Sequence, residues 1–253
     1  MIFFESLMVA LSTYSIIPVP NLEWNEKNMK YAICFFPVVG IICAVLIWII
    51  ARCGALLNVS SFFAAAAAVC VPLLITGGIH IDGFMDTVDA LSSHQSKEKK
   101  LEIMSDPHCG AFAVIYCGIY LILSLAFLYE IYSHGNLYAV CPIYVLSRSV
   151  SAICAVNLPN ARKSGMLSSY TKDTKRKTVN IVMAVTALAS GAAMIFISPI
   201  IGAVAIVSGF LWTVLYCITV KKNFGGVTGD TAGYFLQMFE LFCIVGIWIG
   251  ALL

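Results

Sequence analysis

Three aspartates share one face of a predicted helix at the end of a long apolar run. In the stretch HIDGFMDTVDALSSH, Asp82, Asp86 and Asp89 are spaced i, i+4 and i+7. Seven residues bring a helix back to within about 20° of its starting direction, so the three carboxylates lie on one stripe and repel one another. Carboxylate oxygens that converge from one face are ligands for Mg²⁺, usually together with substrate phosphates. The stripe therefore predicts a metal site, and the alternative is a solvated end of the helix.

Two further segments combine an aspartate with glycines. LEIMSDPHCGAF places Asp106 before Pro107 and Gly110. KKNFGGVTGDTAG, residues 221–233, lies between two apolar runs. Backbone N–H groups of a glycine- and threonine-rich loop beside lysines can cradle phosphate oxygens, although most such loops are plain turns. The candidate phosphate-binding residues are Lys222, Gly225, Gly226, Thr228, Gly229 and Asp230.

Four residues near the aspartates have two interpretations. Gly83 weakens a helix by roughly 1 kcal/mol relative to alanine, which indicates a backbone that a ligand approaches closely. His80, His94 and His108 flank the aspartates without the spacing of metal ligands. We expect the three histidines to be polar loop residues, with contacts to phosphate or base as the alternative.

Arg148 is the only basic residue inside an apolar run, in YVLSRSVSAI. Ionisable residues at such positions face the interior of a helical bundle or a cavity. A structural ion pair with Glu240, in the last apolar run, would satisfy both side chains. The alternative is that Arg148 binds an anion at the carboxylate site, and the sequence does not decide between the two.

The composition is that of an integral membrane protein. Of 253 residues, 60% are hydrophobic and 11% are charged, whereas soluble domains carry roughly 25% charged residues. The apolar runs are continuous and do not alternate, which indicates helices and not a barrel. We predict an all-α polytopic bundle that forms a single domain, 1–253, with about seven transmembrane helices. Their expected ranges are 30–50, 59–79, 109–131, 138–157, 179–197, 199–220 and 234–253.

The basic residues predict the orientation of this bundle. With seven spans, thirteen lysines and arginines fall in segments on one side of the membrane and only Arg52 falls on the other. Positively charged loops stay in the cytoplasm, so we expect the N-terminus inside, the C-terminus outside and the aspartates at the cytoplasmic face. The thirteen are Lys27, Lys30, Lys97, Lys99, Lys100, Arg162, Lys163, Lys172, Lys175, Arg176, Lys177, Lys221 and Lys222. The net charge of +2 thus reflects orientation in a lipid bilayer, and no nucleic-acid partner is expected.

The N-terminal segment MIFFESLMVALSTYSIIPVP lacks the basic region and cleavage site of a signal peptide. It contains Glu5 and ends with Pro18 and Pro20. We expect it to form an interfacial or re-entrant helix on the cytoplasmic face. The ten cysteines fall almost entirely within apolar runs and form no CxxC pair, so they are expected to act as small apolar residues.

Three linked motifs resemble those of the cobalamin synthase family, whose members are adenosylcobinamide-GDP ribazoletransferases. TGGIHIDGFMDTVDAL, KKLEIMSDPHCGAF and FGGVTGDTAG match the DGxxDxxD, xLxIMxDxxxG and GGxTGDxxG patterns of that family in order. IIPVP, FFPVVG and the Ser147–Arg148 pair extend the resemblance over nearly the whole chain. This sequence departs from the family at Ala90, His108 and Gln237, where glycine, arginine and an acidic residue are common.

The resemblance implies a reaction, a cofactor and a site. The reaction transfers the adenosylcobinamide-phosphate moiety of adenosylcobinamide-GDP to α-ribazole or its 5′-phosphate and releases GMP, with Mg²⁺, in a bacterial or archaeal cytoplasmic membrane. Such a transfer requires mainly positioning and charge stabilisation from the protein. Asp89 could instead take the proton from the attacking ribose hydroxyl, because a carboxylate beside the metal is free to act as a base. The aspartates implied as catalytic or metal-binding are Asp82, Asp86, Asp89, Asp106 and Asp230.

Two other functions compete with this one. A CDP-alcohol phosphotransferase also holds metal and diphosphate with aspartates at the membrane surface, but its DGxxAR signature is absent, because Asp86 and Thr87 stand where alanine and arginine would be. A cation transporter would place acidic residues near the bilayer midplane, whereas here they cluster in predicted loops. The sequence does not determine the oligomeric state, and a homo-oligomer is compatible with it.

Overall fold

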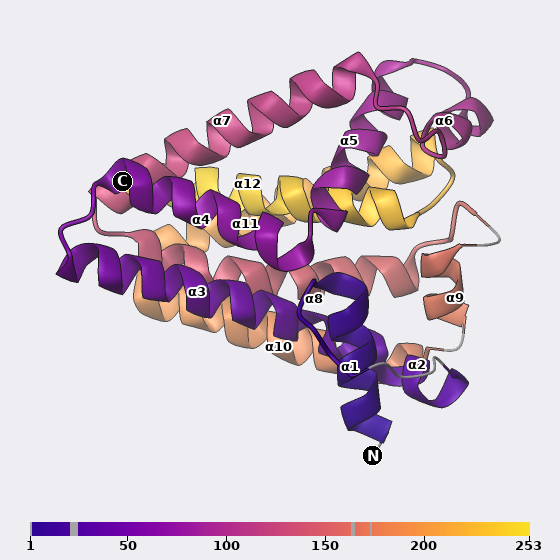
Figure 1. Cartoon of the computed structure of the whole chain (residues 1–253), viewed down its shortest axis with the longest axis horizontal. Coiled ribbons are helices and arrows are strands. Elements are labelled where there is room, and N and C mark those ends of the chain that lie inside the picture. The colour runs from indigo at the N-terminus through magenta and orange to yellow at the C-terminus, as the bar shows by residue number, and fades with distance from the viewer. Residues whose placement is uncertain (1, 21–24, 163–164, 173) are drawn as a thin grey trace.

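The computed structural model describes residues 2–20, 25–162, 165–172 and 174–253, and the described chain is helical (Figure 1). Lys163, one of the thirteen basic residues above, lies outside these ranges. The first half contains α1 (Ile2–Tyr14), α2 (Glu26–Ala32), η1 (Ile33–Phe35), α3 (Phe36–Leu56), α4 (Ser61–Thr76), α5 (Ile79–Ser92), α6 (Lys97–Ile103) and α7 (Ala111–Ser133). The second half contains η2 (Leu137–Val140), α8 (Cys141–Asn157), α9 (Met166–Lys172), α10 (Arg176–Ile197), α11 (Pro199–Asn223) and α12 (Gly229–Leu252).

Six helical segments of the described chain are long and apolar enough to cross a membrane. They are Lys27–Leu56, which includes α3, and α7, η2 with α8, α10, α11 and α12. The predicted separation of the fifth and sixth runs is correct, because α10 ends at Ile197 and α11 begins at Pro199. The prediction of an all-α polytopic bundle is therefore confirmed, with six spans, or seven if the bent pair α4 and α5 is counted as one.

The pair α4 and α5 corrects the predicted span 59–79. Gly77 and Gly78 have φ of +62° and +81°, a conformation that glycine adopts without strain, and the helices on either side of them are bent by 94°. At 1.5 Å per residue, the 16 residues of α4 extend about 24 Å, less than the roughly 30 Å of a hydrocarbon core. The chain therefore turns before α4 completes a crossing. As a result α5, which carries the aspartate stripe, runs across the bundle (Figure 1).

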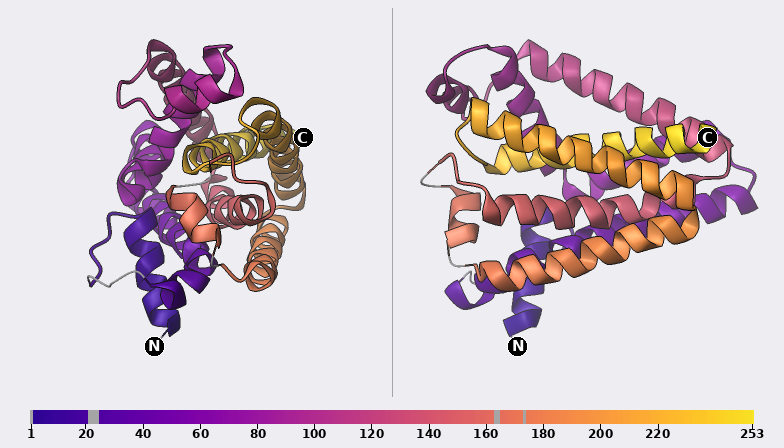
Figure 2. Two further views of the ribbon diagram at one scale, coloured as in Figure 1. Left: turned by 90° about the vertical axis from the view of Figure 1, so that its right-hand side faces the viewer. Right: turned by 180° about the vertical axis from the view of Figure 1, so that it is seen from behind.

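The N-terminal helix α1 also runs across the long helices, as Figures 1 and 2 show. Ser6 anchors its buried side by donating a hydrogen bond of 2.7 Å to the carbonyl of Asn28. Its other side exposes Phe3 and Phe4. The helix α1 is thus short, crosses the bundle and leaves an apolar face open. These are the features expected of the interfacial helix that the sequence predicts.

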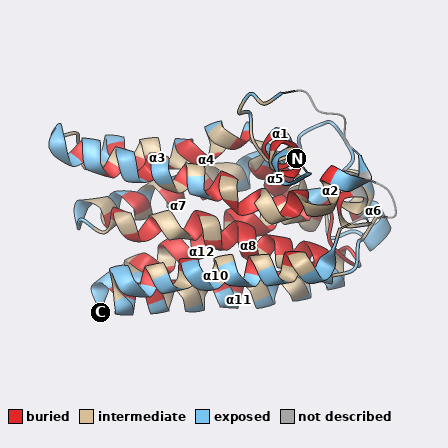
Figure 3. Ribbon diagram, turned by 90° about the horizontal axis from the view of Figure 1, so that it is seen from below, coloured by how far each residue is buried: buried red, intermediate tan, exposed pale blue. Residues whose placement is uncertain are grey.

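The most buried helices are α8 and α12, which pass through the middle of the bundle (Figure 3). Arg148 of α8 and Glu240 of α12 form an ion pair there, and their side chains are 1% and 3% exposed. Ser147 donates a further hydrogen bond of 2.9 Å to Glu240. A charge buried in a membrane protein has to be paired, and the ion pair between Arg148 and Glu240 is one of the two alternatives that the sequence left open.

The two ends of the bundle differ in charge. Figures 1 and 2 place α2, α6 and α9, the start of α10 and the end of α11 at one end, and the connections α3–α4, α7–η2 and α10–α11 at the other. The described members of the thirteen basic residues belong to the first group, and Arg52 lies in the last turns of α3, at the second end. The chain termini also lie toward different ends (Figure 1). The basic asymmetry thus follows the architecture, and which end faces the cytoplasm remains a prediction.

Candidate active site

The helices α5 and α12 cross at two glycines, and this crossing brings together aspartates that are far apart in the sequence. A side chain at Gly83 would place its Cβ 2.8 Å from the Cα and the carbonyl oxygen of Asp230. A side chain at Gly233 would place its Cβ 2.7 Å from the carbonyl oxygen of His80. Gly83 is therefore explained by contact between two backbones and not, as the sequence suggested, by the approach of a ligand.

Four carboxylates form the cluster that results. Partial burial raises the pKa of the Asp86 carboxyl to about 6, and negative charges nearby add to the rise. The neighbours that contribute are Asp82, Asp230 and Asp89, whereas Arg162 opposes the shift. These carboxylates thus repel one another at a place where Asp86 is half-buried. Such a cluster attracts cations.

The cluster is not a closed cage for a metal ion. Among the described residues, no three side chains of histidine, cysteine, aspartate or glutamate lie close enough to hold one. Mg²⁺ is usually held by one or two carboxylates and completes its shell with water and substrate phosphates. The hard oxygens of this donor set therefore fit a Mg²⁺ ion that arrives with a phosphorylated substrate, and they do not fit a structural metal.

Asp106 lies apart from the other four aspartates. Its carboxylate accepts a 2.9 Å hydrogen bond from the backbone N–H of His108 and lies 2.7 Å from Nδ1 of the same residue. These bonds lower the pKa of the Asp106 carboxyl. The same segment nevertheless reaches the cluster through Gly110, because a side chain there would overlap the carboxylate of Asp89. The second motif thus supplies space for Asp89, and its own aspartate faces solvent.

The glycine-rich segment is shorter than predicted. α11 continues to Asn223 and α12 begins at Gly229, so residues 224–228 alone connect them. Thr228 is the N-cap of α12: its hydroxyl accepts a 3.1 Å hydrogen bond from the N–H of Thr231. Gly225 has φ of +78°, which requires glycine. Gly229 and Asp230 therefore lie in the first turn of a helix, where N–H groups are free to bind an anion.

Gly226 has a packing role that the sequence did not predict. The N–H of Val227 donates a 2.8 Å hydrogen bond to the carbonyl of Pro159, and Ala161 donates one of 2.9 Å to the carbonyl of Val227. A side chain at Gly226 would overlap the carbonyl of Pro159. Gly226 is required by this backbone pairing, whereas a Cβ at Gly229 would meet nothing within 4 Å.

The same pairing brings Arg162 to the cluster, which the sequence did not predict. Nη1 of Arg162 lies 3.7 Å from Oδ2 of Asp230, and Nη2 donates a 2.9 Å hydrogen bond to the carbonyl of Leu101. No local pattern distinguishes Arg162 from the other basic loop residues, because the contact depends on the pairing of 158–162 with 224–228. Lys222, a predicted phosphate contact, is exposed in the last turn of α11, and the structure does not bring it to the carboxylates.

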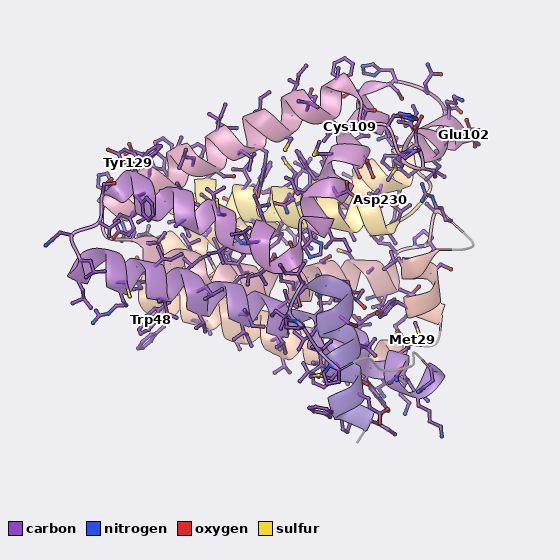
Figure 4. The ribbon with its side chains drawn as sticks, viewed as in Figure 1. Met29, Trp48, Glu102, Cys109, Tyr129 and Asp230 are labelled. Atoms are coloured by element: carbon purple, nitrogen blue, oxygen red, sulfur yellow. The ribbon has the colours of Figure 1, made fainter. Side chains whose placement is uncertain are left out.

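The asymmetry of the molecule is visible in the side chains. Figure 4 shows Asp230 toward the end of the bundle that carries Glu102 and Cys109, and away from the end that carries Trp48 and Tyr129. Arg148 is buried in the middle with Glu240 and does not line either pocket that borders Asp230. Its interpretation as a structural ion pair is the one that the geometry supports.

Two pockets border the carboxylates. The larger has a volume of about 280 Å³ and is lined by Asp82, Asp230 and mainly apolar residues of α1, α3, α5, α8, α9 and α12. The smaller, of about 120 Å³, is lined by Arg162, Thr228, Gly229 and Asp230 among others. His80 lines the larger pocket and is 6% exposed, so the expectation of a polar loop residue is wrong for His80, while His94 and His108 are exposed.

The fold and the site define a class of protein: an all-helical, multi-pass membrane protein with a carboxylate cluster beside two pockets. Within that class, the chain belongs to the cobalamin-5-phosphate synthase family, which matches residues 6–248.

Curated relatives are similar over nearly the whole length. The adenosylcobinamide-GDP ribazoletransferase of Lachnoclostridium phytofermentans is 38% identical over 94% of this chain and 90% of its own length. The protein of the same name from Clostridium botulinum strain Alaska E43 is 32% identical over 98% of both chains. That from Geobacillus sp. strain WCH70 is 28% identical over 97% of this chain and 95% of its own. No solved structure matches the chain significantly.

Proposed function

We propose that this chain is an adenosylcobinamide-GDP ribazoletransferase, which catalyses the final assembly step of cobalamin. It transfers the adenosylcobinamide-phosphate moiety of adenosylcobinamide-GDP to α-ribazole or its 5′-phosphate and releases GMP. Family membership and the names of the relatives support the activity. The observation that carries it in the structure is the clustering of four carboxylates at the α5–α12 crossing, since transfer of a phosphoryl group between two oxygens needs charge stabilisation above all.

The cofactor of this reaction is Mg²⁺, which one or two of the carboxylates of Asp82, Asp86 and Asp230 would hold together with water and the substrate phosphates. These residues project hard oxygen donors from two crossing helices, and their mutual repulsion is relieved when a divalent cation binds. When bound, the ion neutralises the negative charge of the diphosphate and of the leaving GMP. Asp106 remains a candidate from the family resemblance, and its participation requires that its hydrogen bonds with His108 be exchanged.

Asp89 is the residue that we assign as the base. A ribose hydroxyl of the acceptor forms the new bond to the phosphorus that carries the corrinoid, the bond from that phosphorus to the oxygen of GMP breaks, and the hydroxyl proton passes to the Asp89 carboxylate. Asp89 lies at the C-terminal end of the stripe, against Gly110, and contributes less than Asp82 to the charge felt by Asp86. Among the four clustered carboxylates, we therefore assign Asp89 a place off the metal.

The diphosphate binds at the start of α12. Positive potential on one side of Asp230 comes from the free N–H groups of the first helical turn and from the guanidinium of Arg162. The open space at Gly229 leaves room for the diphosphate there. Gly225 and Gly226 shape the connection that holds this turn in place. The twelve described residues of the basic group lie in segments at this end of the bundle, which supports a cytoplasmic location for the site, in the cytoplasmic membrane of a bacterium or archaeon.

The activity is tested with purified protein in detergent. Incubation with adenosylcobinamide-GDP, α-ribazole and Mg²⁺ should release GMP and form a new corrinoid in equal amounts, and chelation of Mg²⁺ with EDTA should stop both. The ribazoletransferase from Lachnoclostridium phytofermentans serves as the positive control. Absence of corrinoid product while the control enzyme is active would refute the proposal.

A further inference from the structure

The larger pocket has one aromatic wall. Tyr14 of α1, Phe36 of α3, His80 of α5 and Tyr170 of α9 all line it. The ring centroids of Tyr14 and Phe36 are 4.3 Å apart, and those of Phe36 and His80 are 5.8 Å apart. Tyr14 and Tyr170 lie 6.1 Å apart. Four rings from four helices, distant in the sequence, thus gather around one space.

Small residues of α8 line the same pocket. Ala152 and Ala155 are buried and line the pocket, so the space between them and the rings exists because their side chains stop at Cβ. A pocket lined by aromatic rings and by small aliphatic side chains accommodates a planar apolar ring system. Asp82 and Asp230 line the same pocket, so a ring bound there borders the carboxylates.

His80 adds a polar requirement to this apolar space. Its Nε2 is buried and has no hydrogen-bond partner among the described residues. A buried polar atom without a partner is costly, and a ligand atom that pairs with it recovers that cost on binding. The imidazole lines the pocket, and a rotation of the ring that presents Nε2 there would favour a planar ligand with one hydrogen-bonding atom on an otherwise apolar ring.

We propose that this pocket binds the base of the nucleoside acceptor, an inference that rests on the proposed function. The base of α-ribazole is a dimethylated benzimidazole: a flat, apolar bicycle whose single free ring nitrogen accepts a hydrogen bond from Nε2 of His80. The ribose then extends past Asp82 and Asp230, along the aspartate stripe of α5, toward Asp89. The pocket is thus the determinant that selects a benzimidazole nucleoside over a purine nucleoside.

The other parts of the two substrates fit this pocket less well. At about 280 Å³ it lies just below the usual range of ligand pockets, roughly 300–1,000 Å³, and a corrin macrocycle with its amide side chains exceeds it. A guanine needs an acceptor for its N1–H and amino group. The carboxylate acceptors in the pocket wall are those of Asp82 and Asp230, which the metal and the diphosphate require. Among the described residues, no carboxylate of the pocket is therefore left to bind a guanine.

The first test fills the pocket. Ala155→Leu should raise the KM for α-ribazole about tenfold or more, because added methyl groups occupy the space of the base. The KM for adenosylcobinamide-GDP should stay within about twofold of wild type, because this substrate binds outside the pocket. Ala184→Leu, on the exposed face of α10, is the matched control and should change neither value. Titration calorimetry with α-ribazole alone should show the same loss of affinity.

The second test needs no change of fold. A riboside of dimethylindole has the shape of α-ribazole but lacks the accepting ring nitrogen, so wild-type protein should bind it about tenfold more weakly. In His80→Phe, the two ligands should bind equally, because the donor is gone while the ring remains.

Three results separate the hypotheses. If Ala155→Leu raises the KM for adenosylcobinamide-GDP and not that for α-ribazole, the pocket holds the guanine and the inference is wrong, while the proposed function stands. Equal binding of the benzimidazole and indole ribosides by wild type would likewise remove His80 from recognition. Failure of the wild type to form any corrinoid refutes the proposed function itself.

Discussion

At the scale of residues, the site brings together negatively charged side chains that repel one another and do not stabilise the fold. Asp86 is half-buried beside other carboxylates, and its pKa is raised to about 6 because burial and these neighbours disfavour its charged form. Its folded-state pKa lies above the unfolded value, so its ionisation weakens the fold at neutral pH, and the penalty disappears as the pH falls below about 4. Such strain is typical of a binding site and is relieved by a cation.

Removal of one carboxylate should therefore separate activity from stability. Asp82→Asn and Asp86→Asn should each lower turnover about 100-fold or more, because asparagine keeps the shape but not the charge that holds Mg²⁺. The thermal unfolding midpoint of Asp86→Asn without Mg²⁺ should be no lower than that of wild type. Glu102→Gln is the control, since Glu102 forms an exposed pair with Lys99 at the same end of the bundle. Near-normal turnover in both aspartate variants would make the stripe structural.

At the scale of elements, the site depends on contacts that no local pattern contains. The apolar runs predict the long helices, because hydrophobic length is a local property. The aspartate stripe is predictable for the same reason. Two contacts join residues that are more than 60 positions apart in the sequence. One is the approach of α5 to α12 at Gly83 and Gly233, and the other is the backbone pairing that places Arg162 beside Asp230. The bend at Gly77 and Gly78 was also missed, because the apolar run continues through it.

The glycine crossing gives a prediction for an element. Gly83→Ala should push α5 away from α12, since its Cβ would lie 2.8 Å from the backbone of Asp230. We expect a stability loss of about 1–3 kcal/mol and an increased Mg²⁺ requirement, because the carboxylates separate. Gly118→Ala in α7 is the matched control, because nothing lies within 4 Å of its added Cβ. Thermal unfolding and Mg²⁺ titration of turnover measure both effects; normal Mg²⁺ dependence in Gly83→Ala would show that the crossing does not position the site.

The start of α12 distinguishes packing from substrate binding. Gly229→Val should unfold like wild type, because the space around Gly229 is open, yet its KM for adenosylcobinamide-GDP should rise about tenfold as the side chain blocks the diphosphate. Gly226→Val should instead lower the unfolding midpoint, since its side chain overlaps the Pro159 carbonyl. An unchanged KM in Gly229→Val would exclude this turn from the diphosphate site.

At the scale of the whole molecule, one end of the bundle is rich in charged residues and the other carries few. The carboxylate cluster, Arg162 and the larger pocket all lie toward the end that carries α6 and α9, which also carries the basic residues (Figures 1 and 4). Both substrates of the proposed reaction carry polar groups that cannot cross a bilayer unaided. A single polar end therefore has to face the compartment that supplies both substrates, and the basic residues indicate the cytoplasm.

This orientation is directly measurable. A membrane-impermeant amine reagent should label Lys97 and Lys175 in inverted membrane vesicles and leave them unlabelled in intact spheroplasts, with the sites mapped by mass spectrometry. An epitope tag after Leu253 should behave in the opposite way, because α12 starts at the carboxylate end and runs to the other end of the bundle. Labelling of Lys97 from outside would invert the molecule and place the carboxylates away from the cytoplasm. Labelling of Lys97 and recognition of the tag from the same side would mean that α12 does not cross the membrane, which would contradict its assignment as a span.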